Sequence, residues 1–207
     1  MPWSVVLGVV TVCGVNWEAL EGAIASAQQA ATFDVRHASG PAARRIQAFE
    51  AFFTQNGFRS PLGIQLKSIQ EKGLPGGSPL VRALLLSEMT TGLLMGAQDA
   101  AEIKDVLVCD LAAGDETFRG MRTEVMCRKG EIVLRDSEGI IATLFQGPDY
   151  RTRLKKETKD VVFFIFSVPG VSAGEVREGV DAVQDLLQAS CAEVHGQVYE
   201  SRAPALL

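Results

Sequence analysis

The sequence has few residues that could bind a metal ion or form a disulfide framework. It contains four cysteines and two histidines, His37 and His195, among 207 residues. The two nearest cysteines, Cys109 and Cys127, are 18 positions apart, so no CxxC pair is present. Zinc sites and disulfide scaffolds both depend on closely spaced cysteines or histidines. We therefore expect reduced thiols and no bound metal.

Long hydrophobic segments are also lacking. The apolar run from Trp3 to Val12, which is broken by Ser4, Gly8 and Thr11, is far shorter than the roughly 20 residues of a membrane helix. It has no basic residues before it, as a signal peptide would. Its many valines are typical of a buried strand. We expect no membrane contact, no targeting segment and a cytoplasmic protein.

Positive charge is in deficit. The chain has 20 Lys and Arg against 25 Asp and Glu, a formal net charge of -5. This balance repels polyphosphate at long range, so broad nucleic-acid binding is unfavourable and DNA is not an expected partner. A local basic patch could still contact a few phosphates.

Several catalytic and cofactor motifs are missing as well. We find no P-loop, dinucleotide fingerprint or HExxH, and we expect no cofactor. Residues 170–174 match the GxSxG pattern of a nucleophile elbow between a strand and a helix. The following acids, Asp181 and Asp185, belong to the same helix, and only His195 comes later. Because Glu175 follows Ser172 by three residues, we interpret Ser172 as a helix N-cap in a capping box.

What the sequence does contain is typical of a folded protein. Hydrophobic residues make up 47% and charged residues 22% of the chain. A chain of this length buries enough surface for a core without disulfides. We expect one domain that spans residues 1–207.

The first half of the chain predicts helices, because apolar residues recur at helical spacing between proline and glycine boundaries. The segment from Pro79 to Thr91 is apolar on nearly every side, which predicts a central helix. Ser60 and Ser78 each precede a proline, a pattern typical of an N-cap. The expected helices are 17–31, 41–57, 61–73 and 79–91.

The second half predicts short strands and one further helix. The run from Val161 to Val168 is continuously apolar, which is typical of a strand covered on both faces. Residues 137–139 are interpreted as a hairpin loop, and a last helix starts at Ser172. We expect the tail after His195, which ends in Arg202-Ala203-Pro204, to be frayed. The expected strands are 106–111, 131–135, 140–145 and 161–168.

The segment from Asp149 to Lys159 carries five cations in nine residues. Two interpretations stay open. The cations could contact phosphates while Tyr150 stacks on a base, or the segment could be a solvated surface. The candidates for RNA contact are Tyr150, Arg151, Arg153, Lys155 and Lys159.

Short motifs occur in a characteristic order over residues 57–192. They are Ser60-Pro61 with Leu66 and Ile69, Leu74-Pro75, Pro79-Leu80-Val81, Thr91-Gly92-Leu93, Gly96-Ala97-Gln98-Asp99, Ala113 to Phe118, Gly130 to Val133 with Asp136, and Asp149 with Arg151-Thr152 and Thr158-Lys159. In this order they resemble the tRNA-editing domain of the phenylalanyl-tRNA synthetase beta chain. The resemblance is closer to the free-standing B3/B4 domain proteins.

This resemblance implies an α+β fold with mixed, mostly antiparallel β-sheets flanked by helices. It implies a trans-editing hydrolase of mischarged aminoacyl-tRNA or related aminoacyl esters, with the tRNA acceptor end or an amino-acid-like molecule as partner. An aminoacyl ester is already activated, so oriented water and oxyanion donors can suffice without a protein nucleophile. The catalytic residues are not assigned. The substrate-pocket candidates are Leu84, Leu85, Gly96, Asp99, Glu116 and Asp149.

The sequence departs from the family at the pocket itself. Where the family commonly has asparagine or threonine, this chain has Leu84 and Leu85, and Arg82 and Gly96 replace an aspartate and a histidine. These changes favour a more apolar pocket that fits an aliphatic or phenyl side chain. The alternative function is therefore a non-catalytic module that binds RNA, a small ligand or a protein partner. The sequence does not predict an oligomeric state.

Overall fold

The fold is α+β, as expected, with five α-helices and antiparallel sheets among the residues that the structure describes. The structure is a computed structural model that describes residues 4–30 and 40–202. Each predicted helix is present, and their ends lie within two residues of the sequence boundaries. The helices are α1 (Trp17–Ala30), α2 (Pro41–Gln55), α3 (Pro61–Lys72), α4 (Pro79–Thr91) and α5 (Ala173–Leu187).

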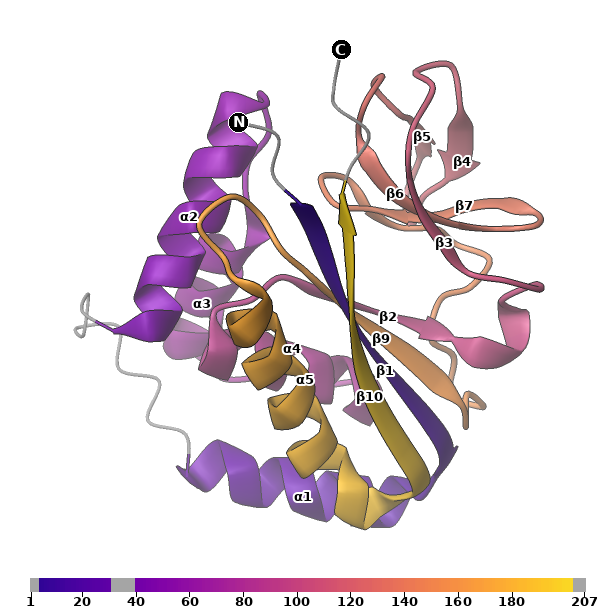
Figure 1. Ribbon diagram of the computed structural model, residues 1–207. Coiled ribbons are helices and arrows are strands. Elements are labelled where there is room, and N and C mark those ends of the chain that lie inside the picture. The colour runs from indigo at the N-terminus through magenta and orange to yellow at the C-terminus, as the bar shows by residue number, and fades with distance from the viewer. Residues whose placement is uncertain (1–3, 31–39, 203–207) are drawn as a thin grey trace.

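Four strands form the main sheet in the order β10-β1-β9-β2, and every neighbouring pair is antiparallel. Figure 1 shows the helices on one side of this sheet, with α5 packed along β1 and β10. Strand β2 forms one edge and β10 the other. The strands are β1 (Ser4–Val15), β2 (Met95–Asp99), β9 (Val161–Phe166) and β10 (Cys191–Arg202).

A second, smaller sheet lies on the other side of the main sheet (Figure 1). Its strand order is β3-β6-β7-β8, and β6 and β7 are joined by the predicted hairpin, in which Asp136 pairs with Gly139. Strands β4 and β5 form a separate two-stranded ribbon beside it. The strands are β3 (Val108–Leu111), β4 (Thr117–Arg119), β5 (Glu124–Met126), β6 (Ile132–Asp136), β7 (Gly139–Thr143) and β8 (Gly147–Pro148), and a short 3₁₀ turn (Ala100–Glu102) follows β2.

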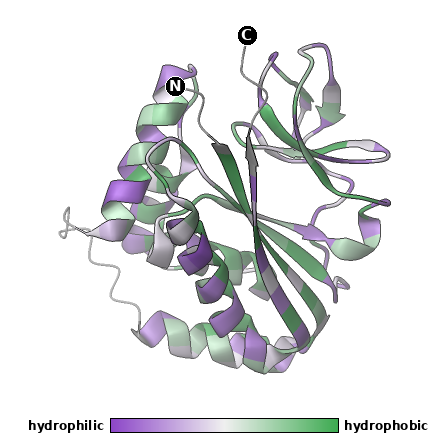
Figure 2. Cartoon of the chain, viewed as in Figure 1, coloured by the Kyte–Doolittle hydropathy of each residue, from purple (hydrophilic) through white to green (hydrophobic). Residues whose placement is uncertain are grey.

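The core lies between the main sheet and the helices, where apolar residues gather along the strands (Figure 2). Close packing there requires small residues. A Cβ on Gly8 of β1 would lie 2.8 Å from Val180 of α5. Gly92 ends α4 with a φ of 71°, and a Cβ there would lie 2.3 Å from the Ala42 carbonyl oxygen of α2. Gly8 therefore lets α5 approach the main sheet, and Gly92 lets α2 approach α4.

The C-terminal segment differs from its prediction. Instead of fraying after His195, the chain forms β10, which pairs with β1 from Cys191 to Arg202. The segment alternates polar and partly buried residues, and its strand forms because β1, about 190 positions away in the sequence, supplies the hydrogen-bond partners. Ala203 and Pro204 lie outside the described residues, as does Ala31.

Among the described residues, no helix has the length and apolar character needed to cross a membrane, and no group of three metal-ligating side chains occurs.

The N-caps divide into two kinds. At α5 both bonds of the predicted capping box are present, because the Ser172 hydroxyl accepts from the Glu175 N–H and the Glu175 carboxylate accepts from the Ser172 N–H. At α3 and α4 the predicted positions are confirmed, because Ser60 and Ser78 are the N-cap residues and a proline follows each. Neither side chain forms a capping bond, however, and both hydroxyl oxygens are buried without a partner among the described residues.

We expect Ser172→Ala to lower the free energy of unfolding by about 1 kcal/mol, because one exposed N–H at the start of α5 loses its acceptor. Ser78→Ala is the matched control and should change stability by less than about 0.5 kcal/mol. Urea denaturation measures both. Equal losses in the two variants would contradict the capping assignment, and loss of an activity at unchanged stability would favour a nucleophilic role for Ser172.

Candidate functional site

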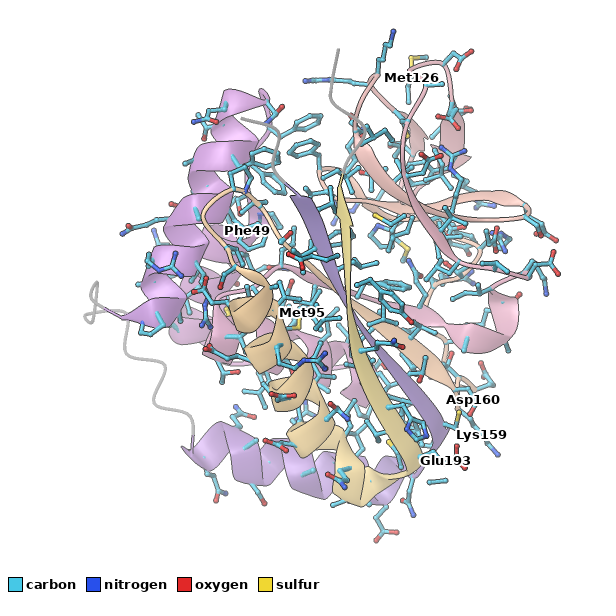
Figure 3. The ribbon with its side chains drawn as sticks, viewed as in Figure 1. Phe49, Met95, Met126, Lys159, Asp160 and Glu193 are labelled. Atoms are coloured by element: carbon cyan, nitrogen blue, oxygen red, sulfur yellow. The ribbon has the colours of Figure 1, made fainter. Side chains whose placement is uncertain are left out.

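A cavity of about 380 Å³ lies where α3 and α4 meet the free edge of β2 and the turn between β7 and β8. We call it the α4–β2 cavity. Leu84 of α4 and Gly96 of β2 line it, together with the end of β9 and the segment at residues 153–154. Met95, another lining residue, is the first residue of β2 and is labelled in Figure 3.

The walls of this cavity are mainly apolar. Leu84, Met95, Leu154 and Phe166 contribute to them, as does Phe145. The Phe145 ring stacks on Phe58 at 4.7 Å between centroids, and Phe52 and Phe53 also contact it. Interlocked rings have few alternative rotamers, so this wall is preorganised.

The edge of β2 supplies a backbone donor to the cavity. The Met95 N–H donates to the Glu88 carboxylate at 3.0 Å, and the Asp99 N–H donates to the Thr152 carbonyl at 2.7 Å. Both N–H groups therefore face away from β9. Because backbone groups alternate along a strand, the Ala97 N–H between them faces the same side. It lies in the wall of the cavity and meets no acceptor in the described part of the chain.

Glu88 is the principal acidic group of the cavity, and the sequence analysis did not single it out. Its side chain lines the cavity, and the residue is only 2% exposed. Burial raises the pKa of its carboxyl group to about 8, although the hydrogen bond from Met95 acts in the opposite direction. Within the described residues it has no ion-pair partner. The available signal was one glutamate inside the apolar run from Leu84 to Met89.

A network of buried hydrogen bonds lies next to the cavity. The Gln98 amide donates to the Ile141 carbonyl at 3.0 Å and accepts from the Thr152 hydroxyl at 2.8 Å. Asp149 accepts hydrogen bonds from the Thr152 backbone and side chain. Asp99 accepts from the Thr158 hydroxyl at 2.6 Å. Asp99 and Asp149 therefore hold the loop after β8 against β2 and do not line the cavity.

Leu85 and Glu116 also lie away from the cavity wall. Leu85 is not among the residues that line the cavity and, like Leu84, packs against the main core. Glu116 lies near the second sheet, where it accepts from Arg135 at 2.7 Å and from the Ala113 N–H. The hydrogen bond from Arg135 lowers the pKa of its carboxyl group. Of the six pocket candidates, Leu84 and Gly96 are the ones that line this cavity.

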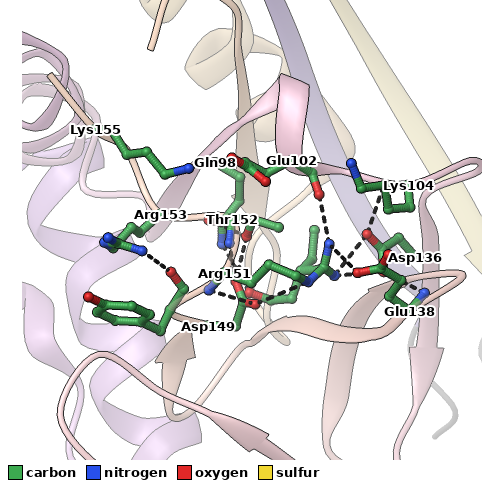
Figure 4. Close-up of polar contacts among 12 residues, drawn as sticks. Gln98, Glu102, Lys104, Asp136, Glu138, Asp149, Arg151, Thr152, Arg153 and Lys155 are labelled. Carbon is green, nitrogen blue, oxygen red and sulfur yellow. Dashed lines mark hydrogen bonds and ion pairs between the residues drawn. The ribbon is translucent and has the colours of Figure 1, made fainter. Parts of the chain in front are cut away.

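Two arginines stack on Tyr150 beside the cavity. The Arg153 guanidinium lies 3.7 Å and the Arg119 guanidinium 4.0 Å from the centre of the Tyr150 ring. Arg153 lines the cavity and donates to the Tyr150 carbonyl, as Figure 4 shows. Neither guanidinium has a carboxylate partner among the described residues. The Tyr150 ring thus contacts two cations, and its stacking on a base stays a prediction.

The other predicted RNA contacts have different surroundings. Arg151 donates to both oxygens of the buried Asp136 carboxylate, at 2.8 and 2.9 Å, and to the Glu102 carbonyl (Figure 4). Lys155 forms an ion pair with the Glu102 carboxylate. Lys159 precedes β9 at the end opposite to Phe166, which lines the cavity. These contacts with RNA stay predictions. Arg153 is the cation of the 149–159 segment that lines the cavity.

A larger cavity, of about 670 Å³, lies against the face of the main sheet that the helices leave open. Val5, Leu7 and Val9 of β1 line it together with the chain from Ile103 to Cys109. The α4–β2 cavity differs because it combines a buried acid, a free backbone donor and an unpaired cation.

No protein-family model matches the chain, and no curated protein matches it. Among solved structures, it is similar to an N-terminal fragment of the phenylalanyl-tRNA synthetase beta subunit from Pyrococcus horikoshii. The sequence identity is 16% and the TM-score 0.49, over 65% of this chain and 48% of the fragment. The chain spans about half of that fragment.

We expect Glu88 to make stability fall as pH rises. The unfolded-state carboxyl ionises near its ordinary pKa of 4.5, whereas the folded one ionises near 8. The contribution of the protonated Glu88 carboxyl to the free energy of unfolding is therefore complete below about pH 4.5. It falls by about 1.4 kcal/mol per pH unit as the pH rises from there to about 8, and it is lost above pH 8. Glu88→Gln keeps an acceptor for the Met95 N–H and should remove this slope.

Urea denaturation between pH 5 and pH 8 provides the measurement. Glu71→Gln, at an exposed position on α3, is the matched control and should retain the wild-type slope. Parallel curves for the wild type and Glu88→Gln would show that Glu88 is ionised in the folded protein at neutral pH.

Proposed function

We propose that the chain, acting as one domain, binds a small amino-acid-type ligand with an apolar body in the α4–β2 cavity. The observation that carries this proposal is a preorganised apolar cavity with a few polar groups that converge on it. Glu88, the Ala97 N–H and Arg153 are those groups. This combination is typical of small-molecule sites, in which apolar walls supply affinity and a few polar groups fix orientation.

The size of the cavity supports a ligand of this class. A volume of about 380 Å³ is near the lower end of the range for ligand pockets, roughly 300–1,000 Å³. It can accommodate an aliphatic or phenyl side chain with its attached backbone atoms. Leu84 is partly buried in the wall, and Gly96 keeps the opposite side open because it has no side chain.

The charges beside the cavity support an anionic group on the part of the ligand that remains outside. Arg153 and Arg119 have no carboxylate partner in the described residues, in contrast to Arg151 and Lys155. A guanidinium is well suited to phosphate, because its planar donors match the geometry of the oxygens. The terminal nucleotide of an aminoacyl-tRNA would place a phosphate in this position while its aminoacyl group occupies the cavity.

Hydrolysis of an aminoacyl ester is the second candidate, and the Ala97 N–H favours it. A free backbone donor in the cavity wall could stabilise the oxyanion that develops when water attacks an ester carbonyl. Such an ester is activated already, so positioned water and this donor could accelerate the reaction without a protein nucleophile. No serine, cysteine or histidine lines the cavity in the described structure, which is consistent with this route and with binding alone.

We expect wild-type protein to bind leucine and phenylalanine methyl esters, and Leu84→Trp to weaken that binding at least tenfold because the indole fills the cavity. Ile64→Trp, at an exposed position on the neighbouring helix α3, is the matched control and should bind as the wild type does. NMR titration of labelled protein gives the affinities. If neither ester shifts resonances of α4 or β2, or if Leu84→Trp binds normally, the cavity is not the ligand site.

For the anionic part of the ligand, the double variant Arg119→Gln/Arg153→Gln should weaken binding of an aminoacylated acceptor-stem RNA. Its affinity should also depend less steeply on salt, because about two fewer phosphate contacts release counterions. Lys67→Gln, at an exposed position on α3, is the control and should leave the slope unchanged. A double variant with the wild-type salt slope would exclude these arginines from RNA contact. Deacylation rates measured on the same complexes separate hydrolysis from binding alone.

A further inference from the structure

Two acceptor oxygens that line the α4–β2 cavity lack a full set of donors. One carboxylate oxygen of Glu88 accepts from the Met95 N–H at 3.0 Å, and the other has no hydrogen bond within the described chain. The side-chain oxygen of Gln65 on α3 is buried and has no partner among the described residues. Buried polar atoms are nearly always hydrogen-bonded, so this oxygen, on the same cavity as the Glu88 carboxyl, favours a donor that arrives with a ligand.

The described part of the chain supplies no counter-ion to Glu88. Arg153 is the only cationic side chain of the described residues that lines the cavity. Its guanidinium stacks on Tyr150 and donates to the Tyr150 carbonyl at 2.7 Å, and it forms no ion pair with Glu88. The neighbouring cation on α4, Arg82, pairs with Glu21 on α1 at 2.6 Å. The Glu88 carboxyl group therefore has no cationic partner within the described chain, and the cavity leaves space beside it for a cation from a ligand.

We propose that Glu88 and Gln65 form an ammonium-binding subsite, so that the ligand of the α4–β2 cavity is a primary amine with an apolar body. This inference rests on the proposed function, because it assumes that the cavity binds a ligand. The carboxylate of Glu88 provides the charge, and the Gln65 oxygen accepts a further N–H. The apolar walls then enclose the remainder of the ligand.

Charge balance makes the binding pH-dependent. With a pKa of about 8, the Glu88 carboxyl of the empty cavity is protonated in roughly nine molecules out of ten at pH 7. An incoming ammonium group keeps its three protons, and the carboxyl group releases its own proton to solvent as the ion pair forms. Affinity for the amine should therefore increase roughly tenfold per pH unit below pH 8 and level off above it.

A simpler role for Glu88 would be structural, as the acceptor that joins the end of α4 to the start of β2. Glu88→Gln separates the two roles, because its amide oxygen can still accept from the Met95 N–H but cannot form an ion pair. Glu71→Gln on α3 is the matched control, since it removes one exposed acid of the same kind.

The probes are 2-phenylethylamine and 2-phenylethanol, which have nearly the same shape. The amine, like a lysine side chain, stays charged below roughly pH 10. At pH 7.5 we expect the wild type and Glu71→Gln to bind the amine at least tenfold more tightly than the alcohol in NMR titrations. Glu88→Gln should bind the two within about twofold and lose the pH dependence. Calorimetry in buffers of different ionisation enthalpy should detect the released proton in the wild type.

Each outcome supports or overturns a specific statement. Equal affinity of the wild type for both probes, with shifts at the cavity, would overturn the ammonium subsite and leave the cavity as a binding site. A preference for the amine that persists in Glu88→Gln would overturn the role of Glu88. If neither probe nor the amino-acid esters bind, the proposed function fails and this inference fails with it.

Discussion

The arrangement of the site depends on the pairing of β9 with strands on both of its sides. Phe163 to Phe166 are buried, and β9 pairs with β1 along one edge and with β2 along the other. This strand fixes β2 in the main sheet although β2 is only five residues long. Since β2 has no further strand neighbour among the described residues, its outer edge is left to α4 and the loop after β8.

An edge strand ordinarily presents its unpaired groups to solvent, where they invite pairing with another chain. Here the edge of β2 is covered, and individual residues, not a further strand, supply the acceptors for its outward N–H groups. Met95 is bonded to Glu88 and Asp99 to Thr152, while the Ala97 N–H between them is left in the cavity wall. The same contacts that protect the edge thus leave one backbone N–H of β2 without an acceptor in the described structure. Glu88 belongs to both arrangements, since it covers the edge and lines the cavity.

The cations of the 149–159 segment differ in whether a carboxylate of the protein pairs with them. Arg151 has an interior partner in Asp136, whose side chain is fully buried, and Lys155 has one in Glu102. Arg153 lies over the Tyr150 ring, on which Arg119 of β4 also stacks. Two like charges on one ring repel each other unless an anion or solvent screens them. This position is therefore electrostatically suited to an anionic group in a chain whose net charge is negative.

Local sequence determined the helices, the hairpin and the buried strand. Their signals are short-range, such as proline and glycine boundaries, the capping box at Ser172 and the apolar run of β9. Strands β2 and β10 were missed because their stability comes from β9 and β1, which are distant in the sequence. The motif that contains Gly96, together with Leu84, indicated the region of the cavity.

Only the tertiary structure decided which side chains line that cavity. Asp99 and Asp149 could not be distinguished from cavity residues by type, because a buried carboxylate in a hydrogen-bond network has the same identity as one that faces a ligand. Glu88 and Arg119 acquire their roles from neighbours on other elements. Burial raises the pKa of Glu88, and Tyr150 brings Arg119 next to Arg153. Desolvation and charge pairing depend on the distances among groups far apart in the chain, and folding alone sets those distances.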